Sequence, residues 1–184
     1  YKKNILILGF GRIGKALAKR CLGFESNIYV YDPFIESSII KNNNCNSIEF
    51  EEGIKIADFI SLHLPLNKKT KNMIAKDQLN MMKDTCILVN TARGGLINEQ
   101  DLVWALTNKK IYGAGLDVYV KEPPNKDNPL LKLENIILSP HNAALTLECR
   151  KRMAVETCEN IVHYLYDMKK LNFSNIINKK KLNL

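Results

Sequence analysis

The stretch GFGRIG at residues 9–14 decides the fold that this sequence predicts. It has the form G-x-G-x-x-G, with a short apolar run at residues 4–8 before it and apolar residues at helical spacing after it, up to Gly23. In such a strand–turn–helix unit the first glycine permits a tight turn, the second lets a pyrophosphate approach the backbone, and the third lets helix and strand pack closely. Free amides at the start of the helix favour a phosphate group there. The stretch therefore predicts a dinucleotide-binding turn.

An acidic residue stands where the second strand is expected to end. Asp32 follows the apolar run at residues 28–31 and lies 18 residues after Gly14. A carboxylate at this point accepts hydrogen bonds from the adenosine ribose hydroxyls and repels a 2′-phosphate, which favours NAD over NADP. The alternative is that Asp32 only forms a turn before Pro33.

Short apolar strands alternate with amphipathic helices along the rest of the chain. Strands are expected at residues 4–8, 28–31, 59–62, 86–89, 112–116 and 136–138. Helices are expected after the glycine turn, weakly at 52–57, after Asn98, and from Thr146 to about residue 165. This alternation predicts an α/β fold, a doubly wound parallel sheet of the Rossmann type with helices on both faces. Residues 64–72 and 118–134 are expected to be functional loops.

The composition is that of a globular protein. Of 184 residues, 46% are hydrophobic and 25% are charged, which suits one domain of good size or two small ones. Apolar runs such as residues 5–8 stop after four residues, so neither a membrane span nor a signal peptide is expected. The five cysteines form no C-x-x-C and have no nearby His, which argues against disulfides and a metal site. A cytoplasmic location is expected, with Cys86 and Cys158 as small core residues.

The charge balance is basic, with 27 Lys and Arg against 19 Asp and Glu, a net +8. Such an excess raises nucleic acid, anionic lipid and phosphorylated ligands as partners. The lysines are scattered in pairs, however, and Arg, the usual reader of bases and phosphates, occurs only five times. We therefore expect no nucleic acid and no membrane as partner, and only a weak preference for an anionic substrate. A nucleic-acid binder would instead show a steep salt dependence of its affinity.

Three polar residues each follow a predicted strand. Arg93, Glu122 and His141 come after the strands at 86–89, 112–116 and 136–138. The carboxyl ends of parallel strands meet at one edge of the sheet, the edge that also carries the glycine turn and where ligands bind. The three side chains are therefore expected to converge on a bound dinucleotide.

Their chemistry suits hydride transfer at a carbon that bears a hydroxyl next to a carboxylate. Arg93 offers a planar fork for the carboxylate. His141 can take or return the hydroxyl proton, and Glu122 would favour its imidazolium form and fix its tautomer. A surface ion pair for Arg93 and a plain loop for Glu122 are the alternatives.

A hydrolase is a further alternative. Asp58, Ser61 and His63 lie close in sequence and include the residue types of a nucleophile, a base and an orienting acid. The nucleophile turn G-x-S-x-G is missing from the sequence, which weakens this hypothesis.

Six segments in register resemble the coenzyme domain of the D-isomer-specific 2-hydroxyacid dehydrogenases. The segments are residues 9–14, LHLPL at 62–66, VNTARGG at 89–95, GLDV at 115–118, Glu122-Pro123 and SPHNAA at 139–144. The resemblance runs from Asn4 to about Leu165 and is strongest for the phosphoglycerate and glyoxylate/hydroxypyruvate branches. It implies NAD as cofactor, a small 2-hydroxy or 2-oxo acid as substrate, and a homodimer.

The resemblance also implies a set of site residues. Arg93 would bind the substrate carboxylate, His141 would be the acid/base and Glu122 its partner, with no metal involved. The implied cofactor-binding residues are Gly9, Gly11, Arg12, Ile13, Gly14, Asp32, Leu64, Pro65, Thr91, Ala92 and Asp117.

One departure from the family concerns the substrate domain. Family members carry a further segment before the glycine strand, which folds together with the C-terminal tail. Here the chain starts at Tyr1, so we expect residues 1–170 to be the dinucleotide-binding domain and 171–184 a tail that returns to a domain whose N-terminal part is missing. Residues 174–178 resemble the closing strand of that domain. Independent turnover should then be poor. A non-catalytic NAD(H)-sensing module, as in a corepressor branch of the family, is the alternative function.

Overall fold

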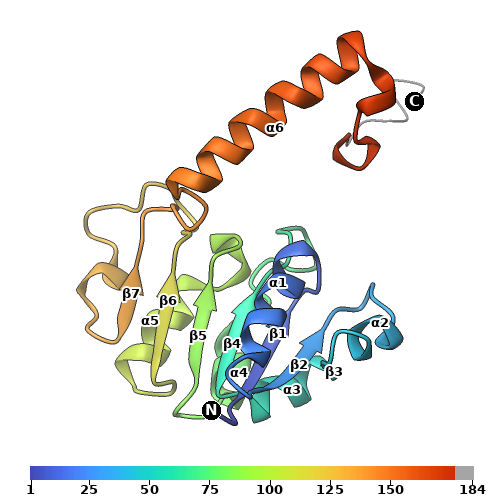
Figure 1. Ribbon diagram of the computed structural model, residues 1–184. Helices are drawn as coiled ribbons and strands as arrows, with labels where there is room; N and C mark the ends of the chain where they lie inside the picture. The colour runs from blue at the N-terminus through green and yellow to red at the C-terminus, as the bar shows by residue number, and fades with distance from the viewer. Residues whose placement is uncertain (177–184) are drawn as a thin grey trace. The chain divides into compact units, whose positions relative to one another are not determined.

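A computed structural model describes residues 1–176 of the chain, which Figure 1 shows as a ribbon. The chain divides into two compact units, Tyr1–His141 and Asn142–Leu184. The boundary expected near residue 170 stays a prediction.

The first unit is built on a parallel sheet of seven strands in the order β3-β2-β1-β4-β5-β6-β7. The strands are β1 (Asn4–Leu8), β2 (Asn27–Tyr31), β3 (Asn46–Ser47), β4 (Phe59–Leu62), β5 (Ile87–Asn90), β6 (Gly113–Leu116) and β7 (Ile136–Leu138). Every pairing between neighbouring strands is parallel. The predicted fold class is confirmed. All six predicted strands are present, and the sequence analysis missed β3, whose two residues are too few to form a pattern.

Helices cover both faces of this sheet, as predicted. They are α1 (Arg12–Leu22), α2 (Ser37–Lys41), α3 (Phe50–Ile56), α4 (Lys76–Met81) and α5 (Glu99–Thr107), with short 3₁₀ turns at Gly94–Leu96 and Pro129–Lys132. The α1 and α2 helices share a core with Ile7, Ile28 and Val30. The α3, α4 and α5 helices bury their apolar side chains against Leu6 and Leu88 from the opposite face. Because β-strand side chains alternate between faces, neighbours such as Leu6 and Ile7 enter different cores.

The second unit contains α6 (Leu147–Tyr166), which begins where the sequence predicts. The hydroxyl of Thr146 accepts a hydrogen bond from the backbone N–H of Cys149 and caps the helix. No residue of α6 is buried within the described part of the chain, and Cys158 is exposed. The prediction of a core role is therefore wrong for Cys158 and right for Cys86, which is buried.

Two 3₁₀ turns, Met168–Lys170 and Phe173–Asn175, follow α6. The predicted closing strand at 174–178 is not formed in its described part, where residues 174 and 175 belong to a 3₁₀ turn; residues 177 and 178 lie outside the described residues. None of the described helices is long and apolar enough to cross a membrane.

Candidate active site at the carboxyl edge of the sheet

The glycine turn joins β1 to α1, and its three glycines are required for different reasons. Gly9 has φ +97°, and a Cβ there would lie 2.7 Å from the carbonyl oxygen of His63. A Cβ on Gly14 would collide with the carbonyl oxygen of Gly9. A Cβ on Gly11 would meet nothing within 4 Å. The fold itself therefore requires Gly9 and Gly14, whereas the space over Gly11 is free to receive a ligand.

The first turn of α1 directly follows Gly11, and its free backbone amides have no side-chain partner. No side chain caps its first turn, and that turn contains no acidic residue. Arg12 is exposed and Ile13 is exposed, although Ile13 is apolar. An uncapped helix start beside a glycine without steric neighbours fits a pyrophosphate group, because the amides and the helix dipole favour negative charge. The residues present thus fit the phosphates of NAD.

Asp32 lies at the end of β2, where the sequence predicts it, and it has a structural task as well. One carboxylate oxygen, Oδ2, accepts a hydrogen bond of 2.8 Å from the backbone N–H of Phe10 in the glycine turn. The other, Oδ1, accepts one of 3.0 Å from the N–H of Phe34. A carboxylate oxygen can accept more than one hydrogen bond, so both remain able to bind ribose hydroxyls. The bond to Phe34 is the turn that the sequence offered as the alternative role of Asp32, the bond to Phe10 was not foreseen, and ribose binding stays a prediction.

Glu122 and His141 form the closest polar contact at this edge. The Nδ1 atom of His141 lies 2.6 Å from Oε2 of Glu122. The hydrogen bond from His141 holds the pKa of Glu122 below its ordinary value, helped by the backbone N–H of Tyr119 and by the charge of Arg93. The structure therefore brings Glu122 and His141 into contact, and Arg93 lies in the loop after β5, at the same edge of the sheet.

The loop that carries Arg93 is held by a buried residue that the sequence analysis missed. Asn90, the last residue of β5, is fully buried and accepts a hydrogen bond from the N–H of Ala92. Its side-chain amide donates to the carbonyl oxygen of Arg93. A Cβ on Gly94 would collide with the backbone of Tyr119, so this loop lies directly against the loop after β6. The signal in the sequence was a polar residue closing an otherwise apolar strand.

The remaining predicted cofactor residues lie at the same edge. Leu64 and Pro65 follow β4, and the hydroxyl of Thr70 donates to the carbonyl oxygen of Pro65 at 2.6 Å, which closes the loop into a turn. Thr91 stands between Asn90 and Ala92 in the loop after β5. Asp117, directly after β6, is buried.

The structure separates the residues of the hydrolase alternative. The hydroxyl of Ser61 lies 2.9 Å from Nε2 of His63, at the carboxyl end of β4. Asp58 precedes that strand, at its other end, where it accepts a hydrogen bond from the N–H of Asn4 and pairs with Lys83 at 3.0 Å. Burial lowers the pKa of His63, and among residues 1–176 no carboxylate is hydrogen-bonded to its ring as a triad requires.

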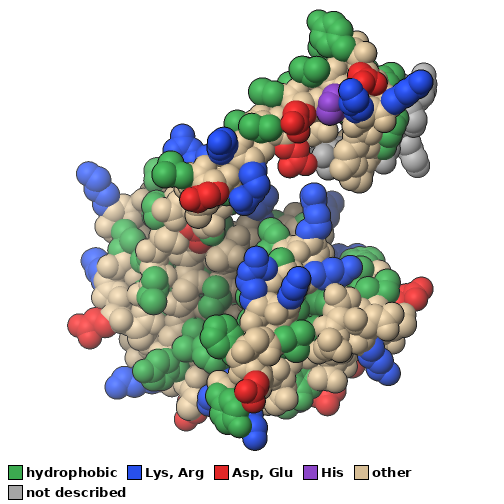
Figure 2. Space-filling view, viewed as in Figure 1, with side chains coloured by type: hydrophobic (Ala, Val, Ile, Leu, Met, Phe, Trp, Pro, Cys, Tyr) green, Lys and Arg blue, Asp and Glu red, His purple; other side chains and the backbone are tan. Residues whose placement is uncertain are grey.

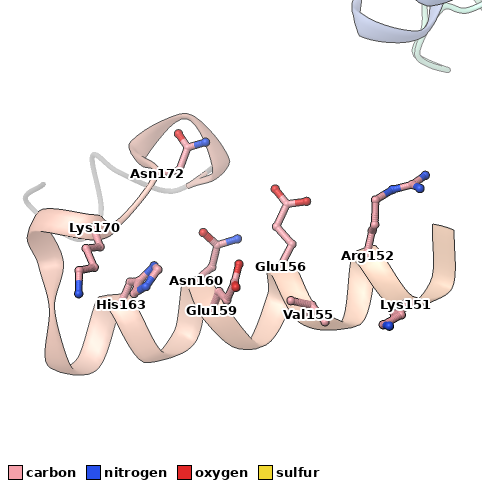
Figure 3. Close-up of a pocket in the computed structure, with 9 residues that line it drawn as sticks. All are labelled: Lys151, Arg152, Val155, Glu156, Glu159, Asn160, His163, Lys170 and Asn172. Carbon is pink, nitrogen blue, oxygen red and sulfur yellow. The ribbon is translucent and has the colours of Figure 1, made fainter. Parts of the chain in front are cut away.

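A separate hollow lies on the second unit and contains none of the predicted site residues. Figure 3 shows it along one side of α6, with Arg152, Glu156, Glu159 and His163 among its lining. It mixes both signs of charge. Within the described residues, no group of three or more His, Cys, Asp or Glu is placed to hold a metal ion.

Comparisons with known proteins identify one family. Residues 1–143 match the family model "D-isomer specific 2-hydroxyacid dehydrogenase, NAD binding domain". The chain is 43% identical over 164 residues to a glyoxylate reductase of Korarchaeum cryptofilum, covering 89% of this chain and 49% of that protein. It is 44% identical over 162 residues to a D-3-phosphoglycerate dehydrogenase of Methanocaldococcus jannaschii, covering 88% of this chain and 31% of that protein.

Solved structures give the same result. A D-lactate dehydrogenase with NAD⁺ from Lactobacillus jensenii superposes with a TM-score of 0.81 at 30% identity, covering 88% of this chain and 52% of that one. The chain thus spans about half the length, or less, of the relatives that it matches.

Proposed function

The chain belongs to the D-isomer-specific 2-hydroxyacid dehydrogenases as their NAD-binding domain, and from this premise we propose that it serves hydride transfer between NAD and a small D-2-hydroxy acid. The proposed substrates are 3-phosphoglycerate, glyoxylate or hydroxypyruvate. The observation that carries the proposal is the 2.6 Å contact between His141 and Glu122. The two residues lie at the sheet edge that also carries the glycine turn and Arg93.

The roles follow from the chemistry of each side chain. Bound NAD would accept the hydride in oxidation and, as NADH, would donate it in reduction. Arg93 binds the substrate carboxylate through two parallel hydrogen bonds, which only a guanidinium offers in that geometry. His141 removes the hydroxyl proton through Nε2, because Nδ1 is engaged with Glu122. Glu122 holds the ring in orientation and stabilises its imidazolium form.

The cofactor is held along the carboxyl edge. Gly11 and the first turn of α1 bind the pyrophosphate, and Asp32 binds the adenosine ribose. The full proposed set is Gly9, Gly11, Arg12, Ile13, Gly14, Asp32, Leu64, Pro65, Thr91, Ala92 and Asp117. The support for it is the open space over Gly11 and the uncapped start of α1.

The chain supplies only part of the catalytic machinery in this proposal. Residues 1–170 act as the coenzyme domain, and residues 171–184 return to a substrate domain. The side chains of His141 and Glu122 are 51% and 37% exposed, so residues 1–141 alone do not exclude water from the reaction. The chain alone should therefore turn over well below the rate typical of intact enzymes, about 10 per second. We further propose a homodimer and a cytoplasmic location, the latter because the five cysteines are free thiols.

A chimera tests this function. The 164-residue segment of this chain that matches the Korarchaeum cryptofilum glyoxylate reductase, at 43% identity, replaces the corresponding segment of that protein. The chimera is expected to oxidise NADH with glyoxylate or hydroxypyruvate, or to reduce NAD⁺ with 3-phosphoglycerate, and H141A is expected to lower kcat by about 10²–10⁴-fold. The matched control is H63A, which removes a histidine of the same edge that has no role in the proposal. A chimera that folds and binds NADH but shows equal activity with and without His141 would overturn the proposal.

A further inference from the structure

Two side-chain hydrogen bonds join the segments that leave β6 and β7. We propose that Tyr119 and Ser139 are positioning residues, which hold the segment carrying His141 against Glu122 and tie it to Asp117. The inference rests on the proposed function, because that function gives the Glu122–His141 pair its task in proton transfer. Tyr119 and Ser139 act through the pair and touch neither substrate nor cofactor.

Ser139 is fixed by all three of its polar groups. Its backbone N–H donates to the carbonyl oxygen of Leu116 at 2.9 Å, which extends the pairing of β6 and β7 by one residue. Its hydroxyl donates to Oδ1 of the buried Asp117 at 2.6 Å. Its carbonyl oxygen accepts a hydrogen bond of 3.0 Å from the hydroxyl of Tyr119. Since His141 is only two residues further along the chain, this anchoring limits where the imidazole can lie.

Tyr119 holds both members of the pair. Its hydroxyl binds the segment of His141 through Ser139, and its backbone N–H donates to Oε1 of Glu122 at 3.0 Å. The side chain is only 7% exposed. Burial, together with the carboxylates of Asp117, Glu122 and Glu99, raises the pKa of Tyr119, so the phenol stays protonated and remains a donor. One buried residue therefore links the carboxylate to the segment that bears the imidazole.

The pair needs such support because it is not protected by burial. His141 and Glu122 are both more than a third exposed, and water competes well for hydrogen bonds between exposed charged groups. The backbone of His141 has φ +54°, a left-handed conformation that residues other than glycine adopt only when their surroundings enforce it. The partly buried hydrogen bonds of Tyr119 and Ser139 anchor the segment two residues before His141 and so contribute to this constraint.

Two single-atom deletions test the inference in the 184-residue chain. Y119F removes one hydroxyl and S139A the other, and the pKa of Glu122 is followed by ¹³C NMR of its carboxyl group. We expect each variant to raise the pKa of Glu122 by about half a unit, because a looser His141 stabilises the carboxylate less. We also expect S139A to weaken NADH binding about fivefold, since Asp117 loses a hydrogen-bond donor. The matched control is Y112F, which removes a phenol hydroxyl from an exposed tyrosine just before β6.

Rescue separates positioning from general structural damage. S139T restores a hydroxyl at the same place and is expected to return both readouts to the wild-type values. Y119F and S139A variants that keep the wild-type fold but leave the pKa of Glu122 unchanged would overturn the inference. If one of the two variants unfolds, the other decides: an unchanged pKa of Glu122 in the variant that folds overturns the inference. Failure of the proposed function is seen separately, as wild-type protein that does not bind NADH.

Discussion

The Nδ1 atom of His141 lies 2.6 Å from Oε2 of Glu122, although the two residues are 19 positions apart in the chain. They meet because β6 and β7 are neighbouring parallel strands whose carboxyl ends open at the same edge. Arg93 reaches this edge from β5, the next strand of the sheet. The order of strands thus assembles the site from three separate loops.

The ion pair makes a small, pH-dependent contribution to stability. The pKa of Glu122 is lowered in the folded chain, first by its hydrogen bond to His141. A carboxyl of this kind stabilises the fold above its unfolded pKa, about 4.3, and that stabilisation is lost as pH falls through the folded pKa. E122Q should therefore lower the free energy of unfolding at pH 7, by less than about 1 kcal/mol because the pair is half-exposed. Urea titrations at pH 7 and pH 3 check this, and a difference that persists at pH 3 would contradict it.

The three glycines of the turn should respond differently to alanine. G11A adds a methyl group where nothing lies within 4 Å, and Gly11 has an ordinary φ of −71°. Its stability should stay within about 0.5 kcal/mol of the wild type, whereas NADH binding should weaken strongly. G14A forces a methyl group against the backbone of Gly9 and should cost about 1–3 kcal/mol or more. Thermal unfolding and NADH calorimetry on both variants measure this, and equal NADH affinity in G11A and wild type would count against a pyrophosphate at Gly11.

Asp32 links cofactor choice to the shape of the glycine turn. D32S removes the charge that disfavours a 2′-phosphate, so the preference for NADH over NADPH should shrink by about tenfold or more. It also removes an acceptor from the backbone N–H of Phe10, so the chain should lose about 1 kcal/mol of stability. Calorimetric titration with both cofactors tests the first effect and urea unfolding the second. If the wild-type chain prefers NADPH, the proposed role of Asp32 is refuted, whereas the assignment of the fold is unaffected.

Most of the fold could be predicted because its signals are local. Each long strand is an apolar run, and the glycine turn and the Asn98 and Thr146 caps mark where helices begin. The short strand β3 could not be predicted, because two exposed polar residues form no hydrophobic pattern. Cys158 shows a second limit of prediction from sequence. An apolar stripe on a helix indicates that the helix can be buried, but it does not show whether another part of the structure covers that stripe.

The sequence predicts the members of the candidate site, and it does not predict all of the residues that hold them in place. Arg93, Glu122 and His141 carry distinctive chemistry after successive strands, which the sheet topology makes neighbours. Asn90 binds within its own loop, to the backbone of Ala92 and Arg93, and its only signal is that it is a polar residue at the end of an apolar strand. Ser139 binds Asp117, which lies 22 positions away, and no local pattern encodes such a distant partner.

The basic surface of α1 predicts a salt-dependent capture of the cofactor. The helix carries Arg12, Lys15, Lys19 and Arg20 and no acidic residue, and none of these four forms an ion pair with a described carboxylate. Figure 2 shows Lys and Arg side chains gathered over this helix. Because the helix begins at the glycine turn, its field attracts the dianionic pyrophosphate toward the site.

K15Q should therefore slow NADH association about two- to threefold at low salt, with little change in dissociation, because a charge near the path of approach acts mainly on the on-rate. The difference should disappear at about 0.5 M salt, where screening shortens the field to a few ångströms. Stopped-flow fluorescence of NADH measures both rates. K109Q, in the turn that precedes β6 at the opposite edge of the sheet, is the matched control. Equal effects of K15Q and K109Q would show that net charge, and not the placement of cations on α1, governs the encounter.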